Sequence, residues 1–260
     1  MKNDPALFSA TELLGAYQRK TLSPVEVTKA TLARIEKFNP KFNAFRLVDA
    51  EKALADAKAS EERWIKGEPA GLVDGVPSTI KDLVDTKGWS TRRGSLTTSD
   101  NGTWENDAPL VARLRENGAV LLGKTTTPEF GWKGVTDSPL TGITRNPWNP
   151  EKTPGGSSGG AAAAAAACLG ALHHGSDGGG SIRMPSGYTG IYGLKPTFGR
   201  VPTWPASGFG TLSHQGPMTR TVSDAALMLT VMAQTDSRDW YALPASETNW
   251  SSYVTKSVKG

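Results

Sequence analysis

The stretch from Thr153 to Thr197 decides the fold: TPGGSSGGAAAAAAACLGALHHGSDGGGSIRMPSGYTGIYGLKPT. It has two segments rich in glycine and serine on either side of an unbroken run of alanines. Glycine lets the backbone approach a neighbouring group closely and adopt positive φ, whereas alanine is the strongest helix former. The composition therefore predicts a loop, a buried helix and a second loop, which bring two serines to one place. A flexible linker is the alternative, but a linker would not enclose seven consecutive alanines.

Short apolar segments alternate with helices along the chain, which predicts an α/β fold with a mainly parallel sheet. Capping boxes at Ser9 and Ser23 begin the first two helices, and the second helix should end before Asn39 and Pro40. The segments expected to be loop-like or irregular, because of their prolines and glycines, are 136–154 and 196–219. The expected helices cover 9–20, 23–38, 50–66, 108–117 and 221–233, and the expected strands lie within 43–48, 72–82 and 119–122.

Composition and charge argue against several classes of protein. The net charge is +4 with both signs interspersed, which is too weak for a nucleic-acid-binding face. The longest apolar run is the alanine stretch, which is far too short to span a membrane. The N-terminus shows no secretion signal, and the single cysteine, Cys168, allows no intrachain disulfide. We therefore expect a cytoplasmic protein that binds neither nucleic acid nor membranes.

The second glycine-rich segment has the composition of an oxyanion hole. Gly178–Gly180 and Ser181 can present consecutive backbone amides around a serine hydroxyl. A serine nucleophile also needs a base. A triad of Ser181, His174 and Asp177 can be drawn, but the G-x-S-x-G turn of α/β-hydrolases is absent at both serine clusters. Lys81, at a predicted strand end, is the alternative base if burial lowers its pKa toward neutrality.

Gly118–Thr125 (GAVLLGKT) matches the phosphate-binding pattern G-x-x-x-x-G-K-[ST]. Its four middle residues are apolar and are typical of a strand, whereas a phosphate-binding loop needs these positions in a turn. We therefore expect no nucleotide site here. His173, His174 and His214 show no spacing typical of a metal site, so we expect neither a metal nor a cofactor.

Three motifs together resemble the amidase signature family: GVPSTIKD at 75–82, PGGSSGG at 154–160 and GSDGGGSIRMPSGYTGIYGLKPTFGR at 175–200. They occur in the order and spacing of that family, and the resemblance covers nearly the whole chain. It implies an α/β amidase-signature fold, in which a mixed and mainly parallel sheet is sandwiched between helices. Residues 1–260 would form the N-terminal and central part of one such domain. Its parts would be a helical N-terminus (about 1–66), a catalytic core (about 70–234) and a tail (235–260).

The family hydrolyses amides with a Ser–Ser–Lys triad, and its motifs place that triad on Ser181, Ser157 and Lys81. The resemblance implies that Ser181 is the nucleophile and forms an acyl-enzyme. Ser157, which follows a cis peptide bond in the family, would pass the proton to Lys81. The other positions that the resemblance implies are oxyanion-hole amides at Gly178, Gly179, Gly180 and Ser181, and supporting residues Ser158, Asp177 and Arg183.

Two stretches, TPEFGW at 127–132 and TRNPW at 144–148, resemble free-standing bacterial amidases. The substrate would then be a small-molecule amide, cleaved to an acid and ammonia or an amine. The glutamine-hydrolysing subunit of tRNA-dependent amidotransferases is the alternative within the family. The tryptophans that are candidates for aromatic walls of the site are Trp89, Trp104, Trp132, Trp148 and Trp204.

Members of the family continue well beyond position 260 with further strands and helices. The resemblance therefore implies that the C-terminal part of the domain is missing here, and three explanations are open. The chain is a piece of a longer one, it is a truncated chain complemented by a C-terminal segment or another copy, or it is an inactive remnant with a binding or assembly role. We expect the first, because an exposed sheet edge promotes aggregation.

Overall fold

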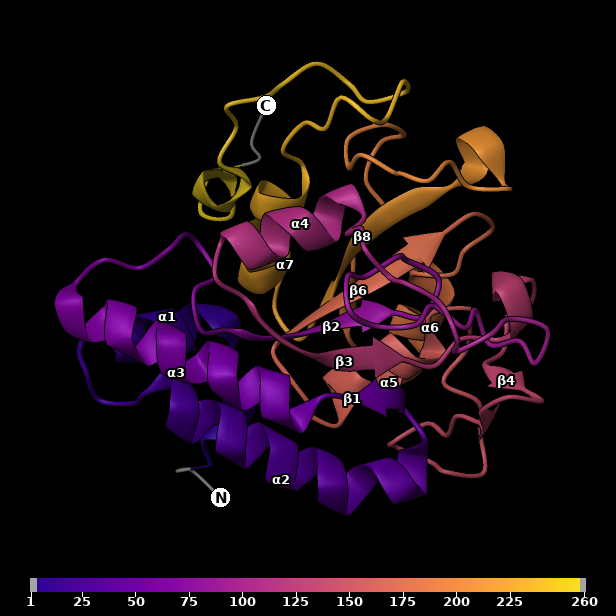
Figure 1. Cartoon of the computed structure of the whole chain (residues 1–260), viewed down its shortest axis with the longest axis horizontal. Coiled ribbons are helices and arrows are strands. Elements are labelled where there is room, and N and C mark those ends of the chain that lie inside the picture. The colour runs from indigo at the N-terminus through magenta and orange to yellow at the C-terminus, as the bar shows by residue number, and fades with distance from the viewer. Residues whose placement is uncertain (1–3, 258–260) are drawn as a thin grey trace.

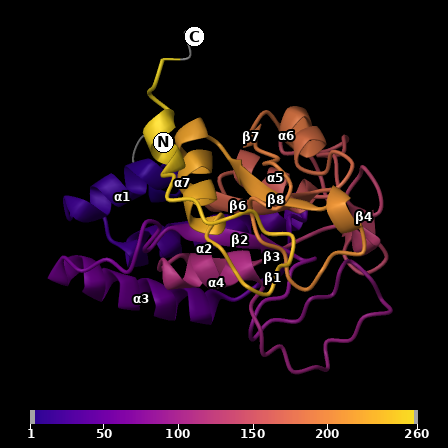
Figure 2. The same ribbon diagram turned by 90° about the horizontal axis from the view of Figure 1, so that it is seen from above.

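The computed structural model describes residues 4–257, so residues 1–3 and 258–260 of the expected domain lie outside the description. Figures 1 and 2 show a twisted sheet with helices on both of its faces. The α-helices are α1 (Ala10–Gln18), α2 (Pro24–Phe42), α3 (Ala50–Lys66), α4 (Pro109–Glu116), α5 (Gly159–Ala166), α6 (Arg183–Thr189) and α7 (Val222–Met232). The 3-10 helices are η1 (Pro5–Leu7), η2 (Glu129–Gly131), η3 (Gly210–Leu212) and η4 (Trp250–Tyr253).

The main sheet has six strands in the order β1-β3-β2-β6-β8-β7. Strands β3, β2 and β6 run parallel to one another at its centre, while β1, β8 and β7 pair antiparallel toward the two edges. The sheet is therefore mixed, as expected, with parallel pairing confined to the three central strands. Its strands are β1 (Phe45–Val48), β2 (Pro77–Lys81), β3 (Val120–Thr125), β6 (Leu172–Asp177), β7 (Tyr192–Gly193) and β8 (His214–Thr219).

Side chains alternate across the sheet, so each face packs against its own set of helices. Leu121 of β3 points into a core shared with α1, α4 and α7, and Ile80 of β2 joins the same core. Val120 and Leu122, on the opposite face of β3, pack against α2, α3 and α5. Ala161 of α5 extends this second layer toward α6. The result is the helix–sheet–helix sandwich that the sequence predicts.

Two strands of the main sheet lie in segments that the sequence analysis leaves as loop or irregular. Strand β6 carries His173, His174 and Gly175, and β8 carries Gly216 and Pro217, which are not strand-forming residues. The prediction fails because tertiary contacts decide these strands. The buried imidazoles of β6 find hydrogen-bond partners in neighbouring strands, and Pro217 forms its ladder pair opposite His174.

The helix start signals are confirmed. Ser9 and Glu12 form a capping box at α1, and Ser23 and Glu26 form another at α2. The predicted end of α2 before Asn39 is wrong, because the helix continues to Phe42.

Pro40 is tolerated inside α2 because it is exposed near the helix end, where a lost backbone hydrogen bond can be replaced by water. The helix ends where Asn43 adopts a left-handed conformation. The segment 136–154 is also not wholly irregular, since it contains the short ribbon of β4 (Asp137–Ser138) and β5 (Gly142–Ile143).

The P-loop-like segment belongs to the sheet. The positions between Gly118 and Gly123 are buried, and Val120–Thr125 form strand β3. Lys124 is also enclosed in the protein. The expectation that this match is a strand and not a phosphate-binding loop is confirmed.

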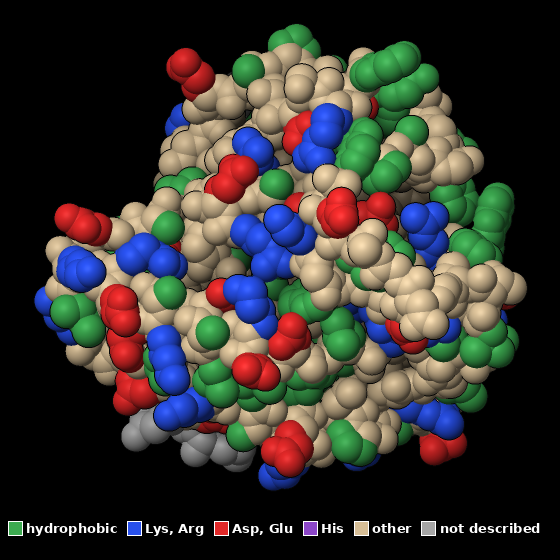
Figure 3. Space-filling view, in the orientation of Figure 1, with side chains coloured by type: hydrophobic (Ala, Val, Ile, Leu, Met, Phe, Trp, Pro, Cys, Tyr) green, Lys and Arg blue, Asp and Glu red, His purple; other side chains and the backbone are tan. Residues whose placement is uncertain are grey.

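Figure 3 shows lysine and arginine side chains intermingled with aspartate and glutamate on the face viewed. This distribution agrees with the interspersed charges of the sequence. Among residues 4–257, no helix combines the length and apolar character needed to cross a membrane.

Helix α5 is buried along almost its whole length, which explains its composition. Ala161–Ala165 are fully enclosed. At the start of the helix, a Cβ on Gly160 would lie 2.4 Å from the backbone nitrogen of Thr126. The absence of side chains therefore lets α5 approach the end of β3 and places its N-terminus against the sheet.

This close approach predicts that Gly160→Ala will destabilise the protein by about 1–3 kcal/mol, because the added methyl must displace the backbone of Thr126. The matched control is Gly187→Ala in α6, where a Cβ meets no atom within 4 Å. That change should stabilise the helix by up to about 1 kcal/mol. Urea unfolding of both variants measures the difference, and equal midpoints would contradict the packing described for α5.

Candidate active site

Lys81 is the last residue of β2 and is fully buried. Its Nζ lies 2.7 Å from the Oγ of Ser157, 2.8 Å from that of Ser158 and 3.0 Å from that of Ser176. These hydroxyls come from the N-terminal side of α5 and from β6. The structure thus brings the predicted Lys81, Ser157 and Ser158 together and adds Ser176, which the sequence analysis does not identify.

Burial lowers the pKa of Lys81 to about 7, because the charged ammonium loses its hydration. The negative charge of Asp177 opposes this effect without reversing it. The N-terminus of α5, which points its positive end toward the lysine, also disfavours a second positive charge there. Lys81 can therefore exist as a neutral amine near neutral pH, which is what the sequence analysis requires of a base.

The hydrogen bonds around Lys81 define which hydroxyl can give it a proton. Ser158 Oγ donates to the carbonyl oxygen of Ser176 at 3.1 Å, so its hydrogen is already committed. Ser158 Oγ also accepts from the amide of Ser176 at 3.2 Å. Ser158 can therefore only accept from Lys81. Ser157 Oγ makes no other hydrogen bond within residues 4–257, and its hydrogen is free for the lone pair of a neutral amine.

Backbone contacts hold the two serine-rich segments together. The peptide bond between Gly156 and Ser157 is cis, as the resemblance implies. The amide of Ser158 donates to the carbonyl oxygen of Ser181 at 3.2 Å. This bond links the segment before α5 to the segment before α6, and Ser157 and Ser181 line the same cavity. The hydroxyl of Ser181 itself makes no hydrogen bond to any described residue.

Asp177 organises the loop between β6 and α6. Its Oδ1 accepts from the amide of Gly180 at 2.7 Å, and its Oδ2 accepts from the amide of Ile182 at 3.1 Å. Arg183 adds a bidentate pair, with Nε and Nη2 donating at 3.0 and 2.9 Å. Burial opposes ionisation of Asp177, but these hydrogen bonds outweigh it and lower the pKa to about 2. A permanent carboxylate therefore shapes this loop.

This arrangement changes the set of amides that can bind an anion. The amide of Gly180, which the sequence analysis places in the oxyanion hole, donates to Asp177 instead. The amides of Gly178, Gly179 and Ser181 make no hydrogen bond within the described part of the chain. They remain available beside the Ser181 hydroxyl.

The site opens into a cavity of about 340 Å³. Trp132 and Trp204 line it, and the ring of Phe209 lies 4.6 Å from that of Trp132. The other three candidate tryptophans lie elsewhere. Trp89 belongs to the hydrophobic core, Trp104 does not line the cavity, and Trp148 is 74% exposed. Tryptophan packs equally well in cores and at surfaces, so the sequence alone does not separate these roles.

The alternative Ser–His–Asp triad is ruled out by the contacts of His174. Its Nδ1 accepts from the backbone amide of Lys81 at 3.3 Å, and its Nε2 contacts Gln215 Oε1 at 2.8 Å. It makes no hydrogen bond to Ser181 or Asp177 in the described structure. Burial lowers its pKa to about 3, so the ring is neutral and structural at physiological pH.

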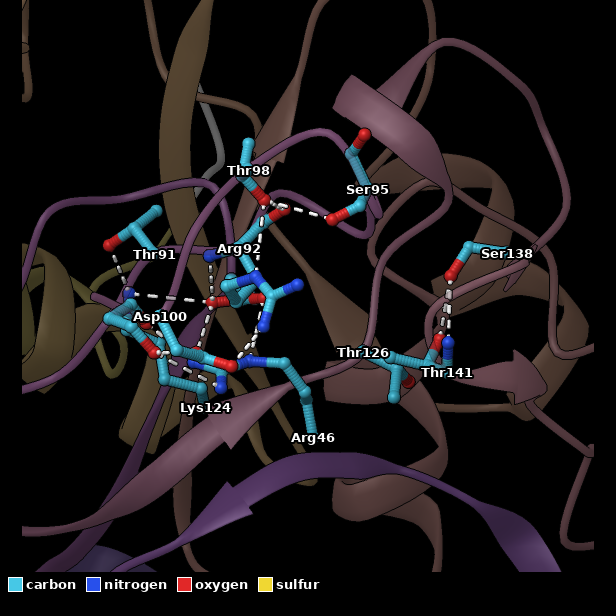
Figure 4. Close-up of polar contacts among 12 residues, drawn as sticks. Arg46, Thr91, Arg92, Ser95, Thr98, Asp100, Lys124, Thr126, Ser138 and Thr141 are labelled. Atoms are coloured by element: carbon cyan, nitrogen blue, oxygen red, sulfur yellow. Dashed lines mark hydrogen bonds and ion pairs between the residues drawn. The ribbon is translucent and has the colours of Figure 1, made fainter. Parts of the chain in front are cut away.

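A second buried lysine braces the chain next to the site. Lys124 Nζ donates to the carbonyl of Val84 at 2.6 Å and to Thr91 Oγ1 at 2.7 Å, and it lies 3.6 Å from Asp82 Oδ1. Arg46 Nε pairs with Asp82 Oδ2 at 2.8 Å. Figure 4 shows how Arg46, Thr91 and Lys124 converge. This cluster fixes the segment after β2, from which four residues line the cavity: Leu83, Val84, Asp85 and Arg93.

Sequence reasoning misses two polar residues of the site, Ser176 and Gln215. Both lie on strands that the sequence analysis does not predict, and they pair directly across β6 and β8. Recognising alternation along β6 would have placed Ser176 on the same side as His174. No comparable signal marks Gln215, because its contact with His174 joins residues 41 positions apart. Among the described residues, no group of three or more His, Cys, Asp or Glu side chains could hold a metal ion.

Comparison with known proteins identifies relatives of nearly the whole chain. The family profile described as Amidase matches residues 26–260. An acylamidase of Rhodococcus erythropolis is 44% identical over 253 residues, which cover 97% of this chain and 53% of the relative. One of the subunits of the glutamyl-tRNA(Gln) amidotransferase of Methylococcus capsulatus is 46% identical over 229 residues, covering 88% and 47%.

A solved bacterial aryl acylamidase of the amidase signature family matches with a TM-score of 0.88 and 36% identity. The match covers 95% of this chain and 52% of that structure. This chain thus spans about half the length of the curated relatives it matches. Together with the mixed sheet and its helical layers, the family profile and the identities confirm the resemblance stated from the sequence: the chain belongs to the amidase signature family.

Proposed function

We propose that this chain hydrolyses carboxylic amides through an acyl-enzyme on Ser181, with Ser157 and Lys81 as the proton relay. The contact that carries the proposal is the 2.7 Å bond between Lys81 Nζ and Ser157 Oγ inside a fully buried cluster. A buried amine with a pKa of about 7 is matched to a base that works near neutral pH. The relationship to an acylamidase and to an aryl acylamidase supports the same reaction class.

The first half of the reaction forms the ester. Ser181 Oγ attacks the carbonyl carbon while its proton passes to Ser157 Oγ and the Ser157 proton passes to neutral Lys81. This step requires the Ser181 hydroxyl to turn toward Ser157, and such catalytic hydrogen bonds commonly tighten when substrate binds. The developing oxyanion is stabilised by the free amides of Gly178, Gly179 and Ser181.

The second half returns the proton and releases the acid. When the C–N bond breaks, protonated Lys81 gives its proton through Ser157 to the leaving amine nitrogen. Water then attacks the ester carbonyl by the same route, and Ser181 is regenerated. Ser158 and Ser176 accept hydrogen bonds from Lys81 and hold its amine toward Ser157. Asp177 and Arg183 keep the anion-binding amides in place.

Ser181→Ala should lower kcat by on the order of 10⁴-fold or more, because the nucleophile is lost. Lys81→Met should lower it by about 10²–10⁴-fold, because the base is lost while the buried volume is retained. The matched control is Ser60→Ala, which removes a fully buried serine of α3 outside the cavity and should retain activity. Steady-state hydrolysis of an aryl amide measures all three, with circular dichroism to verify folding. Full turnover by either active-site variant would refute the assigned roles.

The pH dependence follows from the lowered pKa of Lys81. The relay needs the neutral amine, so kcat/KM should fall about tenfold per pH unit below about pH 7 as Lys81 becomes protonated. His174 and Asp177, whose pKa values are about 3 and about 2, do not titrate in this window. The residual activity of Lys81→Met should therefore lose this limb between about pH 5 and pH 7. A wild-type profile that is flat over this range would contradict a lysine base.

A glutamine-hydrolysing subunit is the second candidate, favoured by the 46% identity to an amidotransferase component. The aromatic walls at Trp132, Trp204 and Phe209 favour the amidase instead. We expect the chain to release an aryl amine from an acylated aryl amine without any partner. Ammonia release from glutamine that depends on charged tRNA and on a second subunit would support the alternative.

An inactive remnant is separated from an enzyme by labelling. A serine-directed fluorophosphonate should modify Ser181, and Ser181→Ala should abolish the label. The described chain forms one sheet with two helical layers, which supports a single amidase-signature domain to which this chain contributes its N-terminal and central part. A complementing C-terminal segment or a second copy remains part of this proposal. Size-exclusion chromatography with light scattering measures the assembly.

A further inference from the structure

Gln215 and His174 form a buried pair at the cavity wall. Gln215 is 5% exposed and lies on β8, directly opposite Ser176 of β6. Its Oε1 lies 2.8 Å from His174 Nε2. Ser176 in turn contacts Lys81 Nζ at 3.0 Å. The side chain of Gln215 therefore lies one strand away from the proposed relay.

The contacts of His174 fix which way the Gln215 amide points. His174 Nδ1 faces the backbone amide of Lys81, which can only donate, so Nδ1 is the accepting nitrogen of the ring. In a neutral imidazole the other nitrogen, Nε2, then carries the hydrogen. A hydrogen on Nε2 requires an acceptor, so the oxygen of Gln215 must face His174. The amide nitrogen of Gln215 must therefore face the opposite way.

That nitrogen has no partner within the described part of the chain. Gln215 lines the cavity, and its Nε2 is not among the enclosed polar atoms that lack a partner, so it reaches open space. Rotating the amide to hide this donor would place an NH₂ group against the N–H of His174. Two donors facing one another in a buried site are strongly unfavourable. The fold thus holds the amide NH₂ of Gln215 toward the cavity in one orientation.

We propose that Gln215 is a specificity-determining residue that donates a hydrogen bond to an acceptor atom on the acyl side of the substrate. The substrate class is an aryl carboxamide whose ring carries an acceptor, such as a pyridine nitrogen. The paired rings of Trp132 and Phe209 line the same cavity and offer the flat surface that a ring requires. His174 acts as a positioning residue, because it fixes the amide without reaching the cavity. The inference rests on the proposed function only in taking this cavity as the substrate site.

The test measures binding, so that it does not depend on turnover. In the Ser181→Ala background, calorimetry gives Kd for benzamide and for pyridine-2-, 3- and 4-carboxamide, with Gln215 intact and with Gln215→Met. We expect at least one pyridine isomer to bind about 3- to 10-fold more tightly than benzamide when Gln215 is present, as one net hydrogen bond provides. Gln215→Met should reduce this ratio to about one.

Two further variants sharpen the result. Gln215→Glu keeps an acceptor for His174 but turns the cavity-facing donor into an acceptor, so it should reverse the preference for the pyridine isomer. Thr203→Val is the matched control, since Thr203 also lines the cavity but its hydroxyl is directed at the carbonyl of Val201. The preference should persist in this control.

The outcomes separate the inference from the proposed function. Equal ratios with and without Gln215, loss of the preference in Thr203→Val, or failure of every carboxamide to bind would each overturn the inference. Hydrolysis by the protein with Ser181 intact is measured separately, and its absence would count against the proposed function alone.

Discussion

The complete burial of the Lys81 amine constrains the structure around it. An ammonium group without water would be strongly destabilising, so the protein surrounds the nitrogen with hydroxyl oxygens and lowers its pKa. Those hydroxyls come from two different elements, the start of α5 and strand β6. Both must therefore end or begin at the same edge of the sheet as β2. Helix α5 meets this requirement because its glycines and alanines allow it to lie directly against the strands.

Asp177 provides the opposing charge and a second anchor. Burial lowers the pKa of Lys81 while the Asp177 carboxylate raises it, and the balance lies near neutrality. The same carboxylate accepts hydrogen bonds from the amides of Gly180 and Ile182 and pairs with Arg183. One buried anion thus tunes the proposed base and shapes the loop that carries the proposed nucleophile. The two halves of the site are linked electrostatically as well as by the backbone bond from Ser158 to Ser181.

Much of the fold could be predicted because its signals are local. Capping boxes at Ser9 and Ser23 involve residues three positions apart, and the alanine run of α5 carries its own helical preference. Strands β6 and β8 could not be predicted, because their histidines, glycines and proline favour no strand by themselves. They become strands since β2 lies beside β6 and β8 covers its other edge. The same long-range pairing places Ser176 and Gln215 at the site.

The sequence by itself determined which residue types meet at the candidate site, because three motifs preserve their order and spacing around Lys81, Ser157 and Ser181. It also determined that a base near Ser181 would have to be a lysine with a lowered pKa. The tertiary structure alone decided which hydrogen each group can use. Ser158 is committed to Ser176, and the Gly180 amide to Asp177. Hydrogen-bond direction depends on atoms brought together from distant parts of the chain, and that information appears only when the strands pair.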